Sequence, residues 1–211
     1  MGASLSTRKL GANLPLGQQL GQLLTALAGW RVEGLELLTE PKYILLVAPH
    51  TSNWDVPYGL ACAHAINLFQ NWKVGFLIKA EATRWPLGLG RLLQWMGGIP
   101  VERHAAQDVV DQVVDVIRRT ERILIAITPE GTRSRRDYWK TGFYRIAMQA
   151  EVPIALTFLD FKRRAAGFGQ IFIPTGDIEA DFEVFRRFFT ADMAKRPELF
   201  GPIRPKPDHN P

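Results

Sequence analysis

Short apolar runs alternate with helix-like stretches from Tyr43 onward, and this alternation constrains the fold more than any other feature of the chain. The runs have the length of buried strands, and the stretches between them are long enough for helices. Such alternation is typical of βαβ units, which build a largely parallel sheet covered by helices. We therefore expect a single α/β domain with a mostly parallel central sheet. The clearest strands are predicted at Tyr43–Ala48, Val74–Ile78, Ile123–Ile127 and Ile154–Leu159.

Three helices are predicted between and after these strands. The first carries an apolar stripe at helical spacing, opens at Asp108 and closes at Arg119, and these charges suit the helix dipole. The second spans Gly142–Ala150 and ends before Pro153, and the third is an amphipathic helix over Glu179–Lys195. We interpret the first of them as a structural helix that covers the sheet.

The chain has 211 residues, which is enough for one sizeable domain and too few for two. We divide it into an N-terminal segment at 1–40, a main domain at 41–201 and an irregular, proline-rich tail at 202–211. No uninterrupted apolar run reaches the roughly 18 residues of a membrane-spanning helix. The N-terminus also lacks the pattern of a secretory signal.

The N-terminal segment holds a predicted amphipathic helix. Five leucines recur at helical spacing, and glutamines lie on the other side of the helix. The leucines are Leu16, Leu20, Leu23, Leu24 and Leu27. One interpretation places this helix in a bilayer interface, and the other places it over the domain core. The sequence leaves both open.

The charge balance indicates a negatively charged partner. The formal net charge is +5 and the isoelectric point is near 9.6, which suits nucleic acid, an anionic lipid surface or a phosphorylated substrate. No zinc-finger, RNA-recognition or basic-zipper pattern supports nucleic acid. The single cysteine, Cys62, excludes an internal disulfide and a cysteine-cluster metal site.

A polar cluster follows the first predicted strand at His50 to Asp55. The carboxyl ends of strands are where α/β folds usually build their sites. Residues five apart point away from each other on a continuous helix, so His50 and Asp55 can meet only if His50 precedes the helix. A histidine oriented by a carboxylate can take a proton from an alcohol near neutral pH. His64 and His104 have no such partner and are interpreted as ordinary residues.

Two further segments lie at predicted strand ends. Thr128 to Arg136 follows the strand Ile123–Ile127 and contains Gly131, which allows close backbone approach, and Arg133, whose guanidinium matches phosphate geometry. On its own, this segment would also fit a solvated basic turn. The segment from Gly97 to Arg103 places an arginine just past another short strand candidate.

Together these segments resemble the glycerol-3-phosphate and lysophosphatidic acid acyltransferase superfamily. Its blocks are a His-x4-Asp pair, a Gly-x-Ile block followed by arginine, and Pro-Glu-Gly-Thr-Arg-Ser, and their order and spacing agree with this chain. The resemblance extends over roughly Tyr43 to Asp160. Combined blocks in the right order are far more specific than any one of them.

The resemblance implies a role for each matching residue. His50 acts as general base, Asp55 orients it, and Lys79 stabilises the tetrahedral oxyanion. Arg103, Glu130, Gly131 and Arg133 shape the acceptor's phosphate site, and Thr132 belongs with them to the substrate-binding residues. The acceptor hydroxyl attacks the thioester directly, which agrees with the absence of a Gly-x-Ser-x-Gly elbow.

The sequence departs from the family pattern at three places. Pro49 replaces the asparagine before the histidine, and Thr128 replaces the phenylalanine before Pro-Glu-Gly. The fourth block, linked to acceptor recognition, reads Val152 to Phe158 without its second proline. The segments Trp139–Tyr144 and Pro174–Asp177 resemble a compact bacterial branch of the superfamily.

We therefore expect an O-acyltransferase of phospholipid biosynthesis that uses acyl-CoA or acyl-carrier protein as co-substrate. The first-choice acceptor is lysophosphatidic acid, followed by glycerol 3-phosphate or another lysolipid. No metal or redox cofactor is implied, and no nucleic-acid partner. We expect a cytoplasmic protein, peripheral on the inner membrane face. The competing hypothesis is a non-catalytic lipid- or phosphate-binding protein of the same fold.

Overall fold

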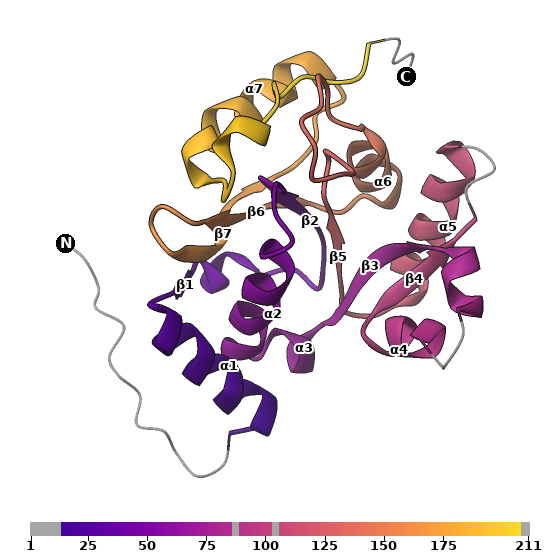
Figure 1. The fold of residues 1–211 in the computed structure, drawn as a ribbon. Helices are drawn as coiled ribbons and strands as arrows, with labels where there is room; N and C mark the ends of the chain where they lie inside the picture. The colour runs from indigo at the N-terminus through magenta and orange to yellow at the C-terminus, as the bar shows by residue number, and fades with distance from the viewer. Residues whose placement is uncertain (1–13, 86–88, 103–105, 208–211) are drawn as a thin grey trace.

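A computed structural model of the protein describes residues 14–85, 89–102 and 106–207 and contains one seven-stranded sheet (Figure 1). The strand order is β1-β7-β6-β2-β5-β3-β4. Strands β2 to β6 are mutually parallel, β7 is antiparallel to β6, and β1 is parallel to β7. This architecture confirms the predicted α/β class with a mostly parallel sheet.

The four predicted strands agree with the structure to within one residue at each end. They are β2 at Lys42–Ala48, β3 at Lys73–Lys79, β5 at Ile123–Ile127 and β6 at Ile154–Asp160. The short candidate before Arg103 is β4 at Gly98–Val101.

Two strands at one edge of the sheet were not predicted. They are β1 at Arg31–Glu33 and β7 at Ala165–Phe172. β1 is only three residues long, and β7 starts with small residues that give no apolar alternation. Gly167 has a φ of +154°, and a Cβ there would lie 2.0 Å from the Glu33 carbonyl oxygen, so the two strands can approach only at a glycine.

The central strand β2 is buried on both faces. Ile44 and Leu46 belong to the cluster packed against one layer of helices, while Tyr43 and Leu45 belong to the cluster on the opposite face. All four side chains are at most 4% exposed. A parallel strand with helices on both sides reads as a continuous apolar run, which explains why it was clear in the sequence.

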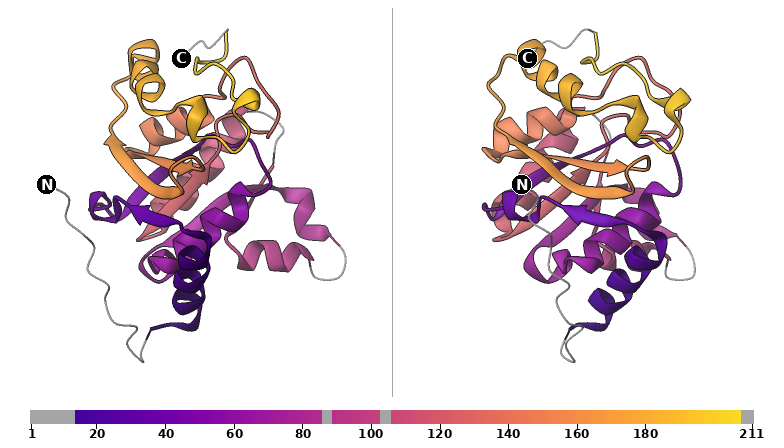
Figure 2. Two further views of the ribbon diagram at one scale, coloured as in Figure 1. Left: turned by 60° about the vertical axis from the view of Figure 1, so that its left-hand side comes forward. Right: turned by 90° about the vertical axis from the view of Figure 1, so that its left-hand side faces the viewer.

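Helices cover both faces of the sheet. One layer contains α5 at Ala106–Arg119, α6 at Gly142–Ala150 and α7 at Ile178–Phe188, which contribute buried side chains to the larger core cluster. The other layer contains α2 at Asp55–Ala65, α3 at Leu68–Asn71 and α4 at Leu89–Trp95 (Figures 1 and 2). Right-handed crossovers explain this division, because the chain runs along the sheet in one direction from β2 to β4 and returns from β4 to β6.

The last helix is shorter than predicted. It ends at Phe188 rather than Lys195, because Phe189 turns to an extended conformation, and a 3-10 turn follows at Ala191–Met193. Phe189 is thereby buried against Trp139 at a ring separation of 5.7 Å. From 202 to 207 the tail contains no helix, and an isolated bridge joins Pro205 to Trp139. Residues 208–211 lie outside the described part.

The N-terminal helix α1, at Leu16–Ala28, packs on α2 with its glycine side. A Cβ at Gly21 would lie 2.5 Å from the Ala65 nitrogen, and the amides of Gln18 and Gln22 donate to the Ala65 carbonyl. The five leucines face outward and are between 47 and 82% exposed. The structure therefore does not bury the leucine stripe in the core. None of the described helices is long and apolar enough to cross a membrane.

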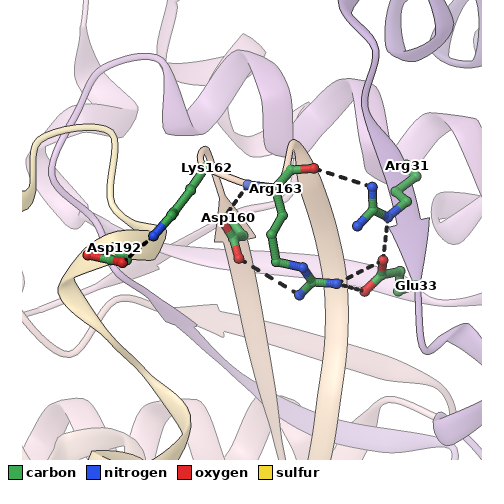
Figure 3. Close-up of polar contacts among 6 residues, drawn as sticks. All are labelled: Arg31, Glu33, Asp160, Lys162, Arg163 and Asp192. Atoms are coloured by element: carbon green, nitrogen blue, oxygen red, sulfur yellow. Dashed lines mark hydrogen bonds and ion pairs between the residues drawn. The ribbon is translucent and has the colours of Figure 1, made fainter.

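Ion pairs join β1 to the hairpin between β6 and β7 (Figure 3). Arg163 lies between Glu33 and the buried Asp160, at 2.8 and 3.8 Å, while Arg31 binds Glu33 from the other side. Partial burial acts to raise the pKa of the Glu33 carboxyl, but hydrogen bonds from Arg31 and Arg163 outweigh it, so this pKa lies below its usual value. Because these pairs are partly exposed, they fix the position of the edge strand more than they stabilise the fold.

We predict that Gly21→Ala destabilises the protein, although the same change in an open helical position usually stabilises it. The new methyl group would overlap the α2 backbone, at an expected cost of about 1–3 kcal/mol. Urea unfolding followed by circular dichroism measures this free energy. Gly142→Ala is the matched control, because a Cβ at Gly142 meets nothing within 4 Å. Equal stability of the two variants would contradict the close contact between α1 and α2.

Candidate active site

The predicted site segments leave the sheet at one edge. β2, β3 and β5 are parallel, and their register places Ala48, Lys79 and the residue after Ile127 close to the same level. His50 and Glu130 follow the ends of the neighbouring strands β2 and β5, as the sequence predicted. The carboxyl edge of the sheet therefore carries the polar side chains, which is the usual position of a site in an open α/β sheet.

His50 and Asp55 form a buried pair. His50 Nδ1 lies 3.0 Å from Asp55 Oδ2, and the two side chains are 13% and 4% exposed. Helix α2 begins at Asp55, so His50 precedes the helix, as the spacing argument required. Because the carboxylate accepts at Nδ1, the other ring nitrogen, Nε2, has the lone pair that can receive a proton from a bound hydroxyl.

The loop between the two residues is held by its own hydrogen bonds. Asp55 Oδ2 also accepts from the backbone N–H of Ser52 at 2.9 Å, and the Ser52 hydroxyl accepts from the N–H of Trp54 at 3.2 Å. Thr51 and Ser52 are both buried. The carboxylate is therefore fixed to the loop as well as to the imidazole, so both members of the pair have a defined orientation.

Glu130 contacts the histidine segment directly. Its Oε1 accepts from the backbone N–H of His50 at 3.0 Å, and its side chain is 8% exposed. Burial raises the pKa of the Glu130 carboxyl above its usual value, and the charge of Asp55 acts in the same direction. Glu130 Oε2 and Asp55 Oδ1 are buried without a hydrogen-bond partner among the described residues. Two carboxylates thus lie beside one imidazole.

The rest of the Pro-Glu-Gly-Thr-Arg segment forms a tight turn. The Gly131 N–H donates to the Thr128 carbonyl, and Gly131 has a φ of +65°, a conformation that favours glycine. A Cβ at Gly131 would lie 2.9 Å from Lys140 Nζ, so the lysine side chain lies over the turn. Thr132 is half-buried, and its hydroxyl accepts from the Ser134 N–H.

Two exposed cations distinguish this turn. Arg133 is exposed, and no partner is found for its guanidinium in the part of the chain that the structure describes. Lys140, which sequence reasoning missed, is also exposed and lies next to Gly131. Its only sequence signal is a basic residue shortly before the start of α6. A turn with an open backbone and forked donors can bind an anion such as a phosphate.

The remaining predicted site residues are less closely placed. Lys79 ends β3 and is exposed, but β5 separates β3 from β2, so Lys79 is about 10 Å from the histidine strand by the usual strand spacing. Arg103 was predicted to bind the acceptor, and it lies outside the described residues, as does His104.

A C-terminal segment that the sequence did not connect with the site contacts both loops. The Arg196 N–H donates to the Thr51 hydroxyl at 3.2 Å, and the Arg135 guanidinium donates to the Phe200 carbonyl. Close packing at Gly201 continues this contact, since a Cβ there would lie 1.9 Å from the Arg136 carbonyl oxygen. Residues 196–201 therefore hold the histidine loop and the glycine turn in one arrangement.

The arrangement is suited to proton transfer from an alcohol beside a bound anion. The imidazole supplies a base whose tautomer is fixed, and the turn supplies cationic donors at the neighbouring strand end. Among the described residues, no group of three or more His, Cys, Asp or Glu side chains is placed to hold a metal ion.

Comparison with protein families identifies the class of protein. The family model described as Acyltransferase matches residues 29–155, which run from the end of α1 into β6 and include both site loops. The chain therefore belongs to this family, which lies within the glycerol-3-phosphate and lysophosphatidic acid acyltransferase superfamily. The match supports acyltransferase activity in general. No curated protein and no solved structure matches the chain.

The contact between Glu130 and His50 can be tested by stability. We predict that Glu130→Gln raises the melting temperature at pH 7.5, because the amide oxygen can still accept from the His50 N–H while the buried charge is removed. A carboxyl whose pKa is raised by folding destabilises the folded protein as the pH rises above the pKa that this carboxyl has in the unfolded chain. The advantage of Gln should therefore shrink toward pH 4.5.

Glu130→Ala is the matched comparison, since it removes the acceptor as well as the charge. We expect it to be less stable than Glu130→Gln by about 1–3 kcal/mol, the cost of an unsatisfied buried donor. Two variants of equal stability at every pH would show that the hydrogen bond to His50 contributes nothing.

Proposed function

We propose that this protein is an O-acyltransferase that moves a fatty acyl group from acyl-CoA or acyl-carrier protein to a hydroxyl of lysophosphatidic acid or a related lysolipid. The observation that carries this proposal is the buried pair of His50 and Asp55 directly beside the Glu130–Arg133 turn. A base next to an anion-binding turn fits an acceptor that carries both a hydroxyl and a phosphate. Its product would enter phospholipid biosynthesis.

In the proposed reaction, His50 Nε2 takes the proton of the acceptor hydroxyl as its oxygen attacks the thioester carbonyl. Asp55 holds the imidazole and balances the charge of the imidazolium. The tetrahedral intermediate then collapses, the carbon–sulfur bond breaks, and the proton passes from His50 to the leaving thiolate. The ester and a free thiol result, and the chemistry requires no bound metal or redox cofactor.

Binding of the acceptor is proposed for the neighbouring residues. Arg133 and Arg103 would bind the phosphate, while Glu130, Gly131 and Thr132 form the turn that presents Arg133. Lys79 is proposed to stabilise the oxyanion, because it ends a parallel strand at the same edge. With β5 between the two strands, this role requires the reacting carbonyl to extend from His50 toward β3.

A peripheral position on the cytoplasmic face of the inner membrane is part of the proposal. The leucines of α1 are exposed on the helix side opposite to α2, as expected for a helix that lies in a bilayer interface. Both proposed lipid substrates have apolar chains that reside in or near a membrane. Nucleic acid is not proposed as a partner, since the cationic turn adjoins a catalytic pair.

The alternative function is a non-catalytic lipid- or phosphate-binding protein of the same fold. A binding protein would need the cationic turn but not a base with an oriented tautomer. The 3.0 Å contact between His50 and Asp55, with both side chains nearly buried, favours the enzyme.

Replacing His50 by Ala should lower turnover about a hundredfold or more, the usual contribution of a general base. The assay is release of free thiol from palmitoyl-CoA with detergent-dispersed lysophosphatidic acid, with glycerol 3-phosphate and acyl-carrier protein as alternative substrates. His64→Ala is the control, because His64 lies on α2 against Phe69. If the turnover of the His50 variant were within threefold of the wild-type value, a difference of about 0.7 kcal/mol in activation free energy, His50 would not be the general base.

Replacing Arg133 by Ala should mainly raise the apparent KM for a phosphorylated acceptor, because Arg133 is proposed to act in binding. An acceptor without a phosphate should be affected much less. Arg187→Ala on α7 removes the same charge from an exposed position and serves as the control. If the apparent KM rose equally for neutral and phosphorylated acceptors, Arg133 would not bind the phosphate.

A further inference from the structure

Exposed large apolar side chains are distributed very unevenly over the described residues. Fourteen such side chains are exposed, and only Met148 and Ile173 belong to the second half of the chain. Isolated exposed apolar residues are normal, but a concentration on one side marks an interaction surface. The other twelve are Leu16, Leu20, Leu23, Leu24, Leu27, Trp54, Val56, Leu60, Trp85, Leu89, Trp95 and Met96.

The charged side chains have the opposite distribution. The 13 residues of α1 include no charged residue. The 11 residues of α2 include Asp55, which is buried beside His50, and the exposed His64, which is counted as neutral at pH 7. On the other side of the sheet, α5 carries three aspartates and two arginines, and α7 carries three acidic residues and two arginines. Helices exposed to water normally resemble α5 and α7. The uncharged exposed surfaces of α1 and α2 are therefore unusual.

The helices with the exposed apolar side chains lie on one side of the sheet. Helix α1 packs on α2, and α4 covers the same face of the sheet as α2. In the left view of Figure 2, α1 and α4 lie in the lower part of the molecule, while α7 lies at the top. We call the surface formed by α1, α2, the 3-10 helix at Ala80–Arg84 and α4 the apolar face.

We propose that the whole apolar face, and not α1 alone, docks on an anionic lipid bilayer. This inference extends the membrane contact in the proposed function and does not require catalysis. Tryptophan and arginine are typical of membrane interfaces, where rings lie at headgroup level and cations meet anionic lipid. The chain from 79 to 96 has two exposed tryptophans, Trp85 and Trp95, the latter 83% exposed.

The charges of this segment complement an anionic surface. Residues 79–96 contain three cations, Lys79, Arg84 and Arg91, and one carboxylate, Glu81, all of which are exposed. Long basic side chains can extend to the headgroups while apolar neighbours enter the interface. A protein partner of defined shape would be specified by polar and charged contacts, and α1 and α2 offer no exposed carboxylate or cation for them.

Docking by this face would bring the catalytic pair to the lipid surface. Trp54 is 58% exposed and immediately precedes Asp55 at the start of α2, and Val56 and Leu60, one helical turn apart, are also exposed on that helix. His50 therefore adjoins one end of the apolar face. A lipid acceptor could reach the base without leaving the interface completely.

Vesicle flotation of the full chain tests the proposal without substrate. The probes are phosphatidylcholine vesicles with and without about one quarter phosphatidylglycerol, which supplies the anionic surface. Trp85→Ser/Trp95→Ser should reduce the partition coefficient on anionic vesicles at least about fivefold, and so should Leu20→Gln/Leu24→Gln. Met148→Gln/Ile173→Gln is the matched control on the other surfaces and should bind as the wild type does.

Two results would overturn the inference. If the tryptophan variant binds normally while the leucine variant does not, α1 alone is the anchor. If the wild type does not bind vesicles but elutes as a dimer that either variant dissociates, the apolar face binds a second copy of the chain. Circular dichroism melting confirms that the variants are folded. Vesicle binding without acyl transfer would reject the proposed enzyme while leaving the docking surface intact.

Discussion

The pairing of β2 with β5 and β6 is the constraint on which the site depends. β2 is buried on both faces, and its register with the two neighbours fixes the level at which each chain leaves the sheet. His50 follows β2 by two residues, and Glu130 follows β5 by three, which brings the Glu130 carboxylate to the backbone of His50. A shift of one strand by a single residue would reverse its faces and separate these groups.

Burial gives the site its electrostatic character. Asp55 and Glu130 are two carboxylates in a nearly dry environment, and His50 contacts both of them. The two carboxylates contact different parts of His50, because Asp55 binds the imidazole ring and Glu130 binds the backbone N–H. The ring therefore has few ways to turn, because both its Nδ1 and its own backbone N–H are held.

Much of this structure could be predicted because local patterns determine it. The buried strands are continuous apolar runs, and the site loops come directly after two of them, so both the sheet and the edge that carries the site were visible in the sequence. The side of α1 that packs could not be predicted, because leucines usually mark the buried side, and here glycines allow the closer approach to α2. Contacts such as Thr51 with Arg196 join residues 145 apart and have no local signature.

The C-terminal contact has a consequence for how the protein is made. The sheet strands that define the site edge are complete once β6 and β7 have been synthesised, but Arg196 and Phe200 come later in the chain. A nascent chain that has just finished β7 therefore has His50, Asp55 and Glu130 without the segment that holds their loops together. Because translation proceeds at roughly 5–20 residues per second, the ordered site would form only seconds after its sheet, once residues 196–201 have been made.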